Sequence, residues 1–137
     1  MTMTTMSPAQ ARAARLPTLN AQVARGAICA DTDTADWVRG DREDPAAWRM
    51  RISRLRAICD HCPVLVQCRE VALRLDAEPH RADADMVRAG MTTIELVEMA
   101  RRQRASLRDA IARDQGVTER QAVGEDQAAG GRYEWVA

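Results

Sequence analysis

The chain has 137 residues, enough for one small domain, and its 20 basic and 20 acidic residues leave no formal net charge. It contains no Phe, and aromatic residues make up only 3% of it, so the bulky side chains that usually fill a core are scarce. Small domains of this kind often gain stability from a metal or from disulfides. No apolar run reaches the ~18 residues of a membrane span, and the start lacks the pattern of a signal peptide. We therefore expect no membrane partner and a cytoplasmic location, where thiols stay reduced.

The N-terminal segment predicts little regular structure. Residues 1–28 are expected to be loosely structured, and residues 1–24 to form a flexible lead-in before the first domain. Within this segment, Ser7 and Pro8 have the pattern of a helix start, and Pro17 is expected to end that short helix.

Two helices are predicted after an acidic loop at residues 30–44. The first begins at Asp44-Pro45, because Asp is a good N-cap and Pro suits the first helical position. Its apolar stripe comprises Trp48, Ile52, Leu55 and Cys59. The second helix is predicted from Cys62-Pro63 to about Leu75. Its stripe comprises Val64, Cys68, Val71 and Leu75. Both stripes contain cysteines, so both helices can present sulfur toward one interior point.

A polar connector at 76–90, which includes His80, precedes a third helix. Thr92 and Glu95 have the spacing of a capping box, and this helix is expected to run toward Gly116. No strand is predicted. The fold class is therefore all-α, a small bundle of four to five short helices with flexible termini. Residues 25–112 are expected to form its domain, and residues 113–137 a disordered tail.

Four cysteines carry the chemistry that this sequence predicts. They are Cys29, Cys59, Cys62 and Cys68. The C-x2-C pair lets two sulfurs turn onto one centre, and four thiolates are the full ligand set of either an iron–sulfur cluster or a tetrahedral zinc ion. In a cytosolic chain this pattern favours metal or redox chemistry over structural disulfides. His61 lies inside the pair and is expected to face solvent, since the cysteines already complete the set.

Three features favour a cluster over zinc at this stage. Pro63 opens a helix whose free amides would stabilise an anionic centre. Zinc sites usually pair two C-x2-C knuckles or add two histidines, and this chain has one knuckle. Apolar neighbours at Ile28, Ile58 and Leu65 would bury the centre. A zinc-bound adaptor and a thiol–disulfide reductase using Cys59 and Cys62 stay open as alternatives, although no thioredoxin-like strand–helix pattern surrounds the pair.

The cysteine pattern, with Pro63-Val64 after the third Cys and Trp37-Val38 soon after the first, resembles the WhiB-like proteins of actinobacteria and their phages. The resemblance covers roughly residues 25–110. It implies one [4Fe–4S] cluster per chain, held by the four cysteines, in a transcriptional regulator that is not an enzyme and has no small-molecule substrate. It also implies sensitivity to oxygen and nitric oxide, and disulfides in the cluster-free form.

The resemblance further implies two macromolecular partners, the principal sigma factor of RNA polymerase through its region four and promoter DNA. Residues expected at the sigma surface are Trp37, Val87, Arg88 and Gly90. The family usually carries G-[VI]-W-[GD]-G in this turn. Here the turn reads Met86-Val87-Arg88-Ala89-Gly90, so Arg88 replaces an indole that would anchor a dry interface better.

A basic stretch on the third helix is the expected DNA contact. It comprises Arg101, Arg102, Arg104 and Arg108. Every basic residue of the chain is Arg, which reflects either a GC-rich genome or phosphate recognition by a planar guanidinium. WhiB-like proteins use a C-terminal basic segment on DNA, whereas the residues alone equally fit a solvated face balanced by Glu98 and Asp109.

Overall fold

The computed structural model describes residues 5–75, 77 and 85–128, and it is mostly helical. Its α-helices are α1 (Pro8–Ala13), α2 (Leu16–Gly26), α3 (Pro45–Asp60), α4 (Leu65–Leu75), α5 (Thr93–Arg102) and α6 (Arg104–Ala128). Two short 3₁₀ helices, η1 (Ile28–Asp31) and η2 (Thr34–Trp37), precede α3. The predicted small α-helical fold is confirmed. The connector around His80 lies outside the described residues.

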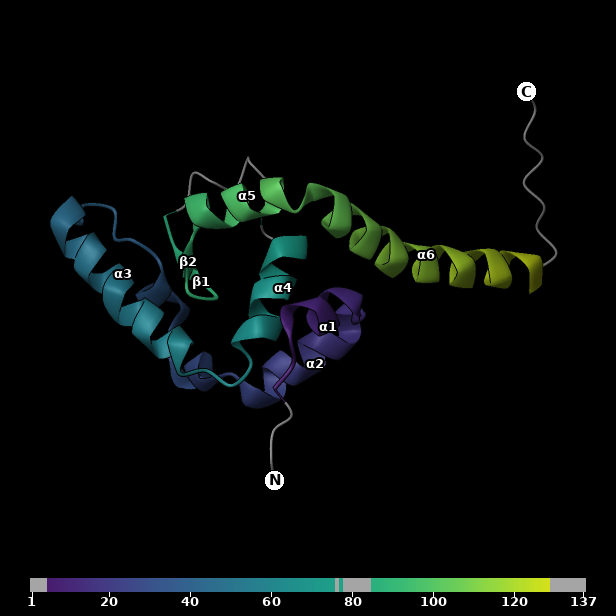
Figure 1. The fold of residues 1–137 in the computed structure, drawn as a ribbon, viewed down its shortest axis with the longest axis horizontal. Coiled ribbons are helices and arrows are strands. Elements are labelled where there is room, and N and C mark those ends of the chain that lie inside the picture. The colour runs from purple at the N-terminus through teal and green to yellow at the C-terminus, as the bar shows by residue number, and fades with distance from the viewer. Residues whose placement is uncertain (1–4, 76, 78–84, 129–137) are drawn as a thin grey trace.

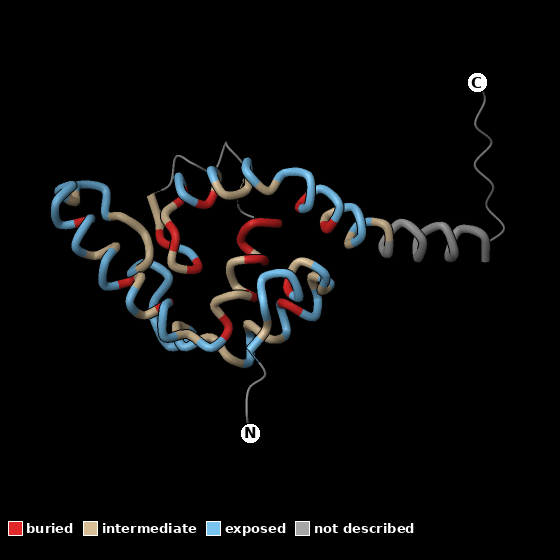
Figure 2. The backbone as a smooth tube through the Cα atoms, in the orientation of Figure 1, coloured by how far each residue is buried: buried red, intermediate tan, exposed pale blue. Residues whose placement is uncertain are grey.

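Helix α4 lies at the centre of the fold. It contacts α1 and α2 on one side and α5 and α6 on another, while α3 stands apart beyond a small hairpin (Figure 1). Buried residues gather along α4 and around the hairpin (Figure 2). One core cluster joins Leu73 of α4 to Leu96 and Leu107 of α5 and α6. A second joins Trp48 and Leu55 of α3 to Val87 of the hairpin. The core therefore consists of two clusters, one between α4, α5 and α6 and the other between α3 and the hairpin.

The N-terminal segment is more ordered than the sequence predicted. Ser7 caps α1 in a reciprocal capping box with Gln10, and Pro8 occupies the first turn. Pro17 lies in the first turn of α2 instead of ending α1. Leu19 is fully buried where α2 packs on α4. These two helices occupy residues that were expected to be loosely structured, because their apolar side chains find a partner in α4 that local sequence does not reveal.

Helix α3 agrees with its prediction. Asp44 accepts hydrogen bonds from the amides of Ala46 and Ala47, and Pro45 is the first helical residue. The predicted stripe is buried at Trp48, Leu55 and Cys59. Helix α4, in contrast, begins at Leu65 and not at Cys62. The Cys62 amide bonds the Cys59 carbonyl at 2.9 Å, so Cys62 belongs to the turn between the helices.

The prediction that the chain has no strand is wrong. Strands β1 (Val87–Arg88) and β2 (Met91–Thr92) pair antiparallel through a two-residue loop. Ala89 and Gly90 in that loop have φ of 51° and 73°, which is the type I′ geometry that matches the twist of a hairpin. Strands of two residues are too short to show an alternating pattern, which is why periodicity missed them.

The helices after the hairpin follow part of the prediction. The Thr92–Glu95 capping box is present at the start of α5. The expected single helix is broken at Gln103, whose ψ of 18° leaves the helical range, and α6 continues to Ala128. That end lies beyond residue 113, where a disordered tail was expected to begin, and residues 129–137 lie outside the described part. No helix in the described part is long and apolar enough to cross a membrane.

Candidate metal centre

The structure brings the four cysteines to the wall of one cavity. Cys29 comes from η1, Cys59 from the last turn of α3, Cys62 from the following turn and Cys68 from α4. The cavity has a volume of about 360 Å³, and all four side chains are free thiols. Most of the other lining residues are apolar, including Ile58 and Leu65, and Arg88 also lines the cavity.

Local structure explains how distant cysteines meet. Cys59 and Cys62 share a tight turn in which the Leu65 amide bonds the Cys62 carbonyl at 3.3 Å, and this turn leads directly into α4. Cys68 lies in the first turn of α4, and its amide donates a hydrogen bond to the Val64 carbonyl at 2.9 Å. Helix α2 packs on α4, and η1, which follows α2 and contains Cys29, contacts α3. Tertiary packing therefore brings Cys29 to the other three cysteines, although it precedes Cys59 by 30 positions.

Burial controls the protonation of these thiols. Burial raises the pKa of Cys59, and a hydrogen bond from the Gly90 amide partly opposes that effect. Burial also raises the pKa of Cys68 to about 11, and the neighbouring thiols add to the rise. Both groups are therefore neutral thiols at pH 7 in the metal-free chain. A thiophilic metal centre would displace their protons, because thiolate is the form that ligates.

The hairpin turn packs directly on Cys59. A Cβ added at Gly90 would lie 3.4 Å from the Cys59 Cβ and 3.5 Å from Nη2 of Arg69. The same Nη2 donates a hydrogen bond to the Ala89 carbonyl at 3.1 Å. The turn is thus held in place from α4 while its amide faces a cysteine sulfur, an arrangement that tunes thiolate ligands.

Substituting Gly90 tests this turn. We expect Gly90→Ala to lower the free energy of unfolding by about 1–2 kcal/mol, because a side chain at φ +73° enters the left-handed region. Gly116→Ala is the matched control, since it adds the same methyl in α6 with nothing within 4 Å and is expected to stabilise by about 1 kcal/mol. Urea unfolding followed by circular dichroism measures both. Equal stability of the Gly90 variant and the wild type would contradict the role of this turn.

Four thiols are a complete ligand set for either an iron–sulfur cluster or a tetrahedral zinc ion. Among the described residues, no group of three or more His, Cys, Asp or Glu lies close enough to hold one metal ion. Four sulfurs around one zinc would stand roughly 3.8 Å apart, given Zn–S bonds of about 2.3 Å. A cubane is larger and takes its four thiolates at its corners. His61 is exposed, and its Nδ1 lies 2.7 Å from the Ala57 carbonyl, so this nitrogen contacts the backbone of its own helix.

The residues expected at a sigma surface divide into two groups. Trp37 and Arg88 both line the cysteine cavity, and Arg88 is exposed. Nε1 of Trp37 donates a hydrogen bond to Thr32 Oγ1 at 2.8 Å. Val87 is only 2% exposed and packs with Trp48. Val87 therefore belongs to the core, because its side of the hairpin faces α3, and its expected contact with a sigma factor stays a prediction.

The four arginines expected on DNA are exposed, and two of them lie beside an acidic residue. Arg101 and Arg102 both lie within 3.8 Å of Glu98. Arg104 and Arg108 lie beside a shallow apolar groove between α4 and α6. The break at Gln103 distributes the four arginines over two helices instead of one.

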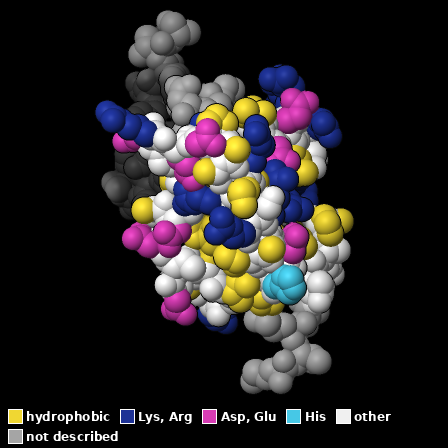
Figure 3. Space-filling model, turned by 90° about the vertical axis from the view of Figure 1, so that its left-hand side faces the viewer, with side chains coloured by type: hydrophobic (Ala, Val, Ile, Leu, Met, Phe, Trp, Pro, Cys, Tyr) yellow, Lys and Arg dark blue, Asp and Glu magenta, His cyan; other side chains and the backbone are white. Residues whose placement is uncertain are grey.

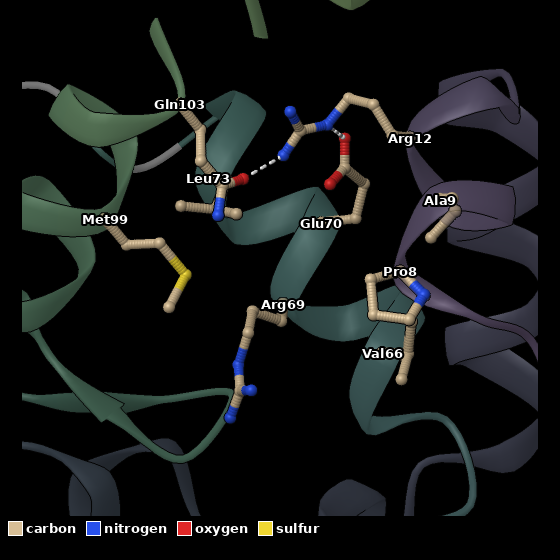
Figure 4. A pocket seen from close by; sticks show the side chains of 10 residues that line it. Pro8, Ala9, Arg12, Val66, Arg69, Glu70, Leu73, Met99 and Gln103 are labelled. Atoms are coloured by element: carbon tan, nitrogen blue, oxygen red, sulfur yellow. Dashed lines mark hydrogen bonds and ion pairs between the residues drawn. The ribbon is translucent and has the colours of Figure 1, made fainter. Parts of the chain in front are cut away.

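A buried polar network on another face of α4 was missed by sequence reasoning. Nε of Arg12 lies 2.7 Å from Oε1 of Glu70, and the same oxygen accepts from Nε of Arg74 at 3.0 Å. Figure 4 shows Arg12 and Glu70 facing each other at the edge of a second cavity, of about 390 Å³, with Gln103 beside them. Nη1 of Arg74 also bonds Asp114 at 3.0 Å. The only local signal was the i,i+4 spacing of Glu70 and Arg74 inside a largely apolar helix.

The chain matches a known protein family. The family model described as transcription factor WhiB matches residues 24–95, a stretch that contains all four cysteines and the hairpin. Neither a curated protein nor a solved structure matches the chain.

Proposed function

Because the chain belongs to the WhiB family of transcription factors, we propose that it is a transcriptional regulator whose four cysteines hold one [4Fe–4S] cluster. The observation that carries the proposal is the convergence of Cys29, Cys59, Cys62 and Cys68 on one largely apolar cavity. Thiolates are the usual ligands of such clusters, and four of them complete the set.

The residues around the cavity have distinct roles in this proposal. The four sulfurs bind the cluster, the Gly90 amide donates to the Cys59 sulfur, and Ile58 and Leu65 exclude water. When bound, the cluster supplies electron exchange and reactivity toward oxygen and nitric oxide. Without it, four neighbouring thiols remain, and oxidation can join such thiols as disulfides. The chain would then lose the centre that ties η1 to α3 and α4.

We propose that the regulator acts in the cytoplasm through promoter DNA and region four of the principal sigma factor. Trp37 and Arg88 border the cavity, and Gly90 lies in the hairpin turn beside them, so a partner seated there would contact the protein next to its metal centre. Arg101, Arg102, Arg104 and Arg108 are the candidate phosphate contacts on α5 and α6. Residues 25–112 would form the functional domain, with residues 1–24 and 113–137 as its extensions.

Anaerobic purification of the full chain tests this proposal. We expect a brown protein with broad visible absorption and nearly equal amounts of iron and acid-labile sulfide. Co-expression with the principal sigma factor is expected to yield a complex that co-purifies. A colourless protein that contains zinc and no sulfide would replace the proposal with the zinc-bound adaptor.

A further inference from the structure

We propose that the solvent-facing side of α3, defined by Arg49 and Arg54, is a binding surface for the phosphate backbone of double-stranded DNA. The inference rests on the proposed regulatory function and names a DNA contact other than α5 and α6. Helix α3 contains four arginines, and its only acidic residue is Asp60 at the last position. Such a helix presents an electrostatic footprint suited to a polyanion.

Two of the four arginines form ion pairs with other residues of the protein. Nη1 of Arg51 lies 2.6 Å from Oε1 of Glu43, and its guanidinium stacks 5.3 Å from the Trp48 ring centroid. Arg56 forms an ion pair with Glu95 at the start of α5. These pairs hold α3 against its neighbours and fix which side of the helix faces solvent.

The other two, Arg49 and Arg54, are exposed, and neither side chain has an ion pair or hydrogen bond with the residues that the structure describes. At 100° per residue they lie on the two edges of the solvent-facing arc of the helix. Between them the arc carries Ala46, Met50, Ser53 and Ala57, with Asp60 at its C-terminal end, all exposed. Figure 3, which views the side of the molecule where α3 lies, shows arginine side chains on this face together with acidic and apolar ones.

This surface suits phosphate better than an acidic protein partner. Stable protein interfaces are centred on aromatic or apolar anchors, whereas the arc offers only Met50 between small residues. Phosphate contacts need exposed guanidinium groups and no dry pocket. The face is also less neutralised than α5, where Arg101 and Arg102 share Glu98.

The position of α3 connects this surface to the cysteine cavity. The arginine face and Cys59 belong to the same continuous helix, on opposite sides of it. Trp48, Leu55 and Cys59 face inward, and this buried stripe sets the orientation of the arginines outward. The packing that places Cys59 at the cavity therefore also orients the phosphate-binding face.

Salt-dependent DNA binding tests the proposal. The double variant Arg49→Gln/Arg54→Gln would be compared with the wild type on a random-sequence 30-base-pair duplex by fluorescence anisotropy, with full-length protein purified anaerobically. We expect weaker binding and a slope of log K against log salt that is smaller by about 2, since each phosphate contact contributes roughly 0.9. The matched control, Arg15→Gln/Arg25→Gln, also removes two positive charges, from the exposed N-cap of α2 and from an exposed position in its last turn. It is expected to keep the wild-type slope.

The outcomes separate this inference from the proposed function. Equal slopes for the α3 variant and the wild type would overturn it, as would equal losses in both double variants or no duplex binding by the wild type at low salt. Loss of binding confined to the α3 variant, with unchanged circular dichroism, supports it. Iron and sulfide contents report on the cluster alone, so a missing cluster would overturn the proposed function and leave the α3 comparison readable.

Discussion

Serine in place of Cys29 is expected to abolish cluster assembly, with iron and acid-labile sulfide falling to near zero in anaerobically purified protein. Cys29 lies 30 positions before Cys59 in the sequence but lines the same cavity. A serine hydroxyl fits the same space and lacks the thiolate that iron–sulfur clusters require. Because metal binding and folding are coupled, we also expect the visible absorption to disappear and the helical signal to melt at a lower temperature.

The control for this variant is His61→Ala. His61 lies between Cys59 and Cys62, but it is exposed and bonded to a backbone carbonyl. Its loss is expected to leave iron and sulfide at wild-type levels. Full cluster content in the Cys29→Ser protein would show that three cysteines and another group hold the centre. Loss of the cluster in the His61 variant would identify that group and contradict the four-cysteine set.

The elements that sequence predicted well carry their signals locally. Asp44-Pro45 predicts the start of α3, and Thr92 with Glu95 predicts the start of α5, because capping residues bind amides within the next turn. The apolar stripe of α3 was readable for the same reason, since 3.6-residue periodicity is a property of the helix itself.

The elements that sequence missed depend on distant partners. Ala11 and Leu19 are fully buried, and they are covered by α4 and its neighbours, which lie far along the chain. The hairpin was hidden because its turn is Ala89-Gly90, and Ala is an unusual choice for a residue with φ of 51°. Asn-Gly or Asp-Gly there would have signalled a type I′ turn.

The convergence of the cysteines was partly predictable from the sequence, whereas the surroundings of the candidate site were not. The spacing of Cys59, Cys62 and Cys68 follows from one turn and one helix, so three of the cysteines converge by local geometry alone. The position of Cys29 depends on the packing of α2. The burial of Val87 could not be predicted, because register in a two-residue strand decides whether a side chain faces the core, and so short a pattern cannot fix that register.

The buried, charged network around Arg74 predicts a large loss of stability when this residue is replaced. The Arg74 side chain is 1% exposed. Its guanidinium donates to Glu70, to Asp114 and to three backbone carbonyls of the α1 end, at 2.9–3.2 Å. Those carbonyls belong to Ala11, Arg12 and Ala14. A guanidinium has five N–H donors, and each of them has an acceptor here. The network therefore fastens α1 and α6 to α4.

Arg74→Met is expected to lower the free energy of unfolding by about 3–5 kcal/mol, because it strands buried carboxylates and carbonyls without donors. Arg74→Lys retains the charge but offers fewer donors in a different geometry, so it should fall between Met and wild type. Arg39→Met removes a partly exposed ion pair with Asp85 and is expected to cost under about 1 kcal/mol. Urea midpoints measure the series, and proteolysis near residue 15 reports whether α1 detaches. Equal midpoints for the Arg74 and Arg39 variants would show that α1 and α6 are held by apolar packing, since the polar network would then contribute no more than a surface pair.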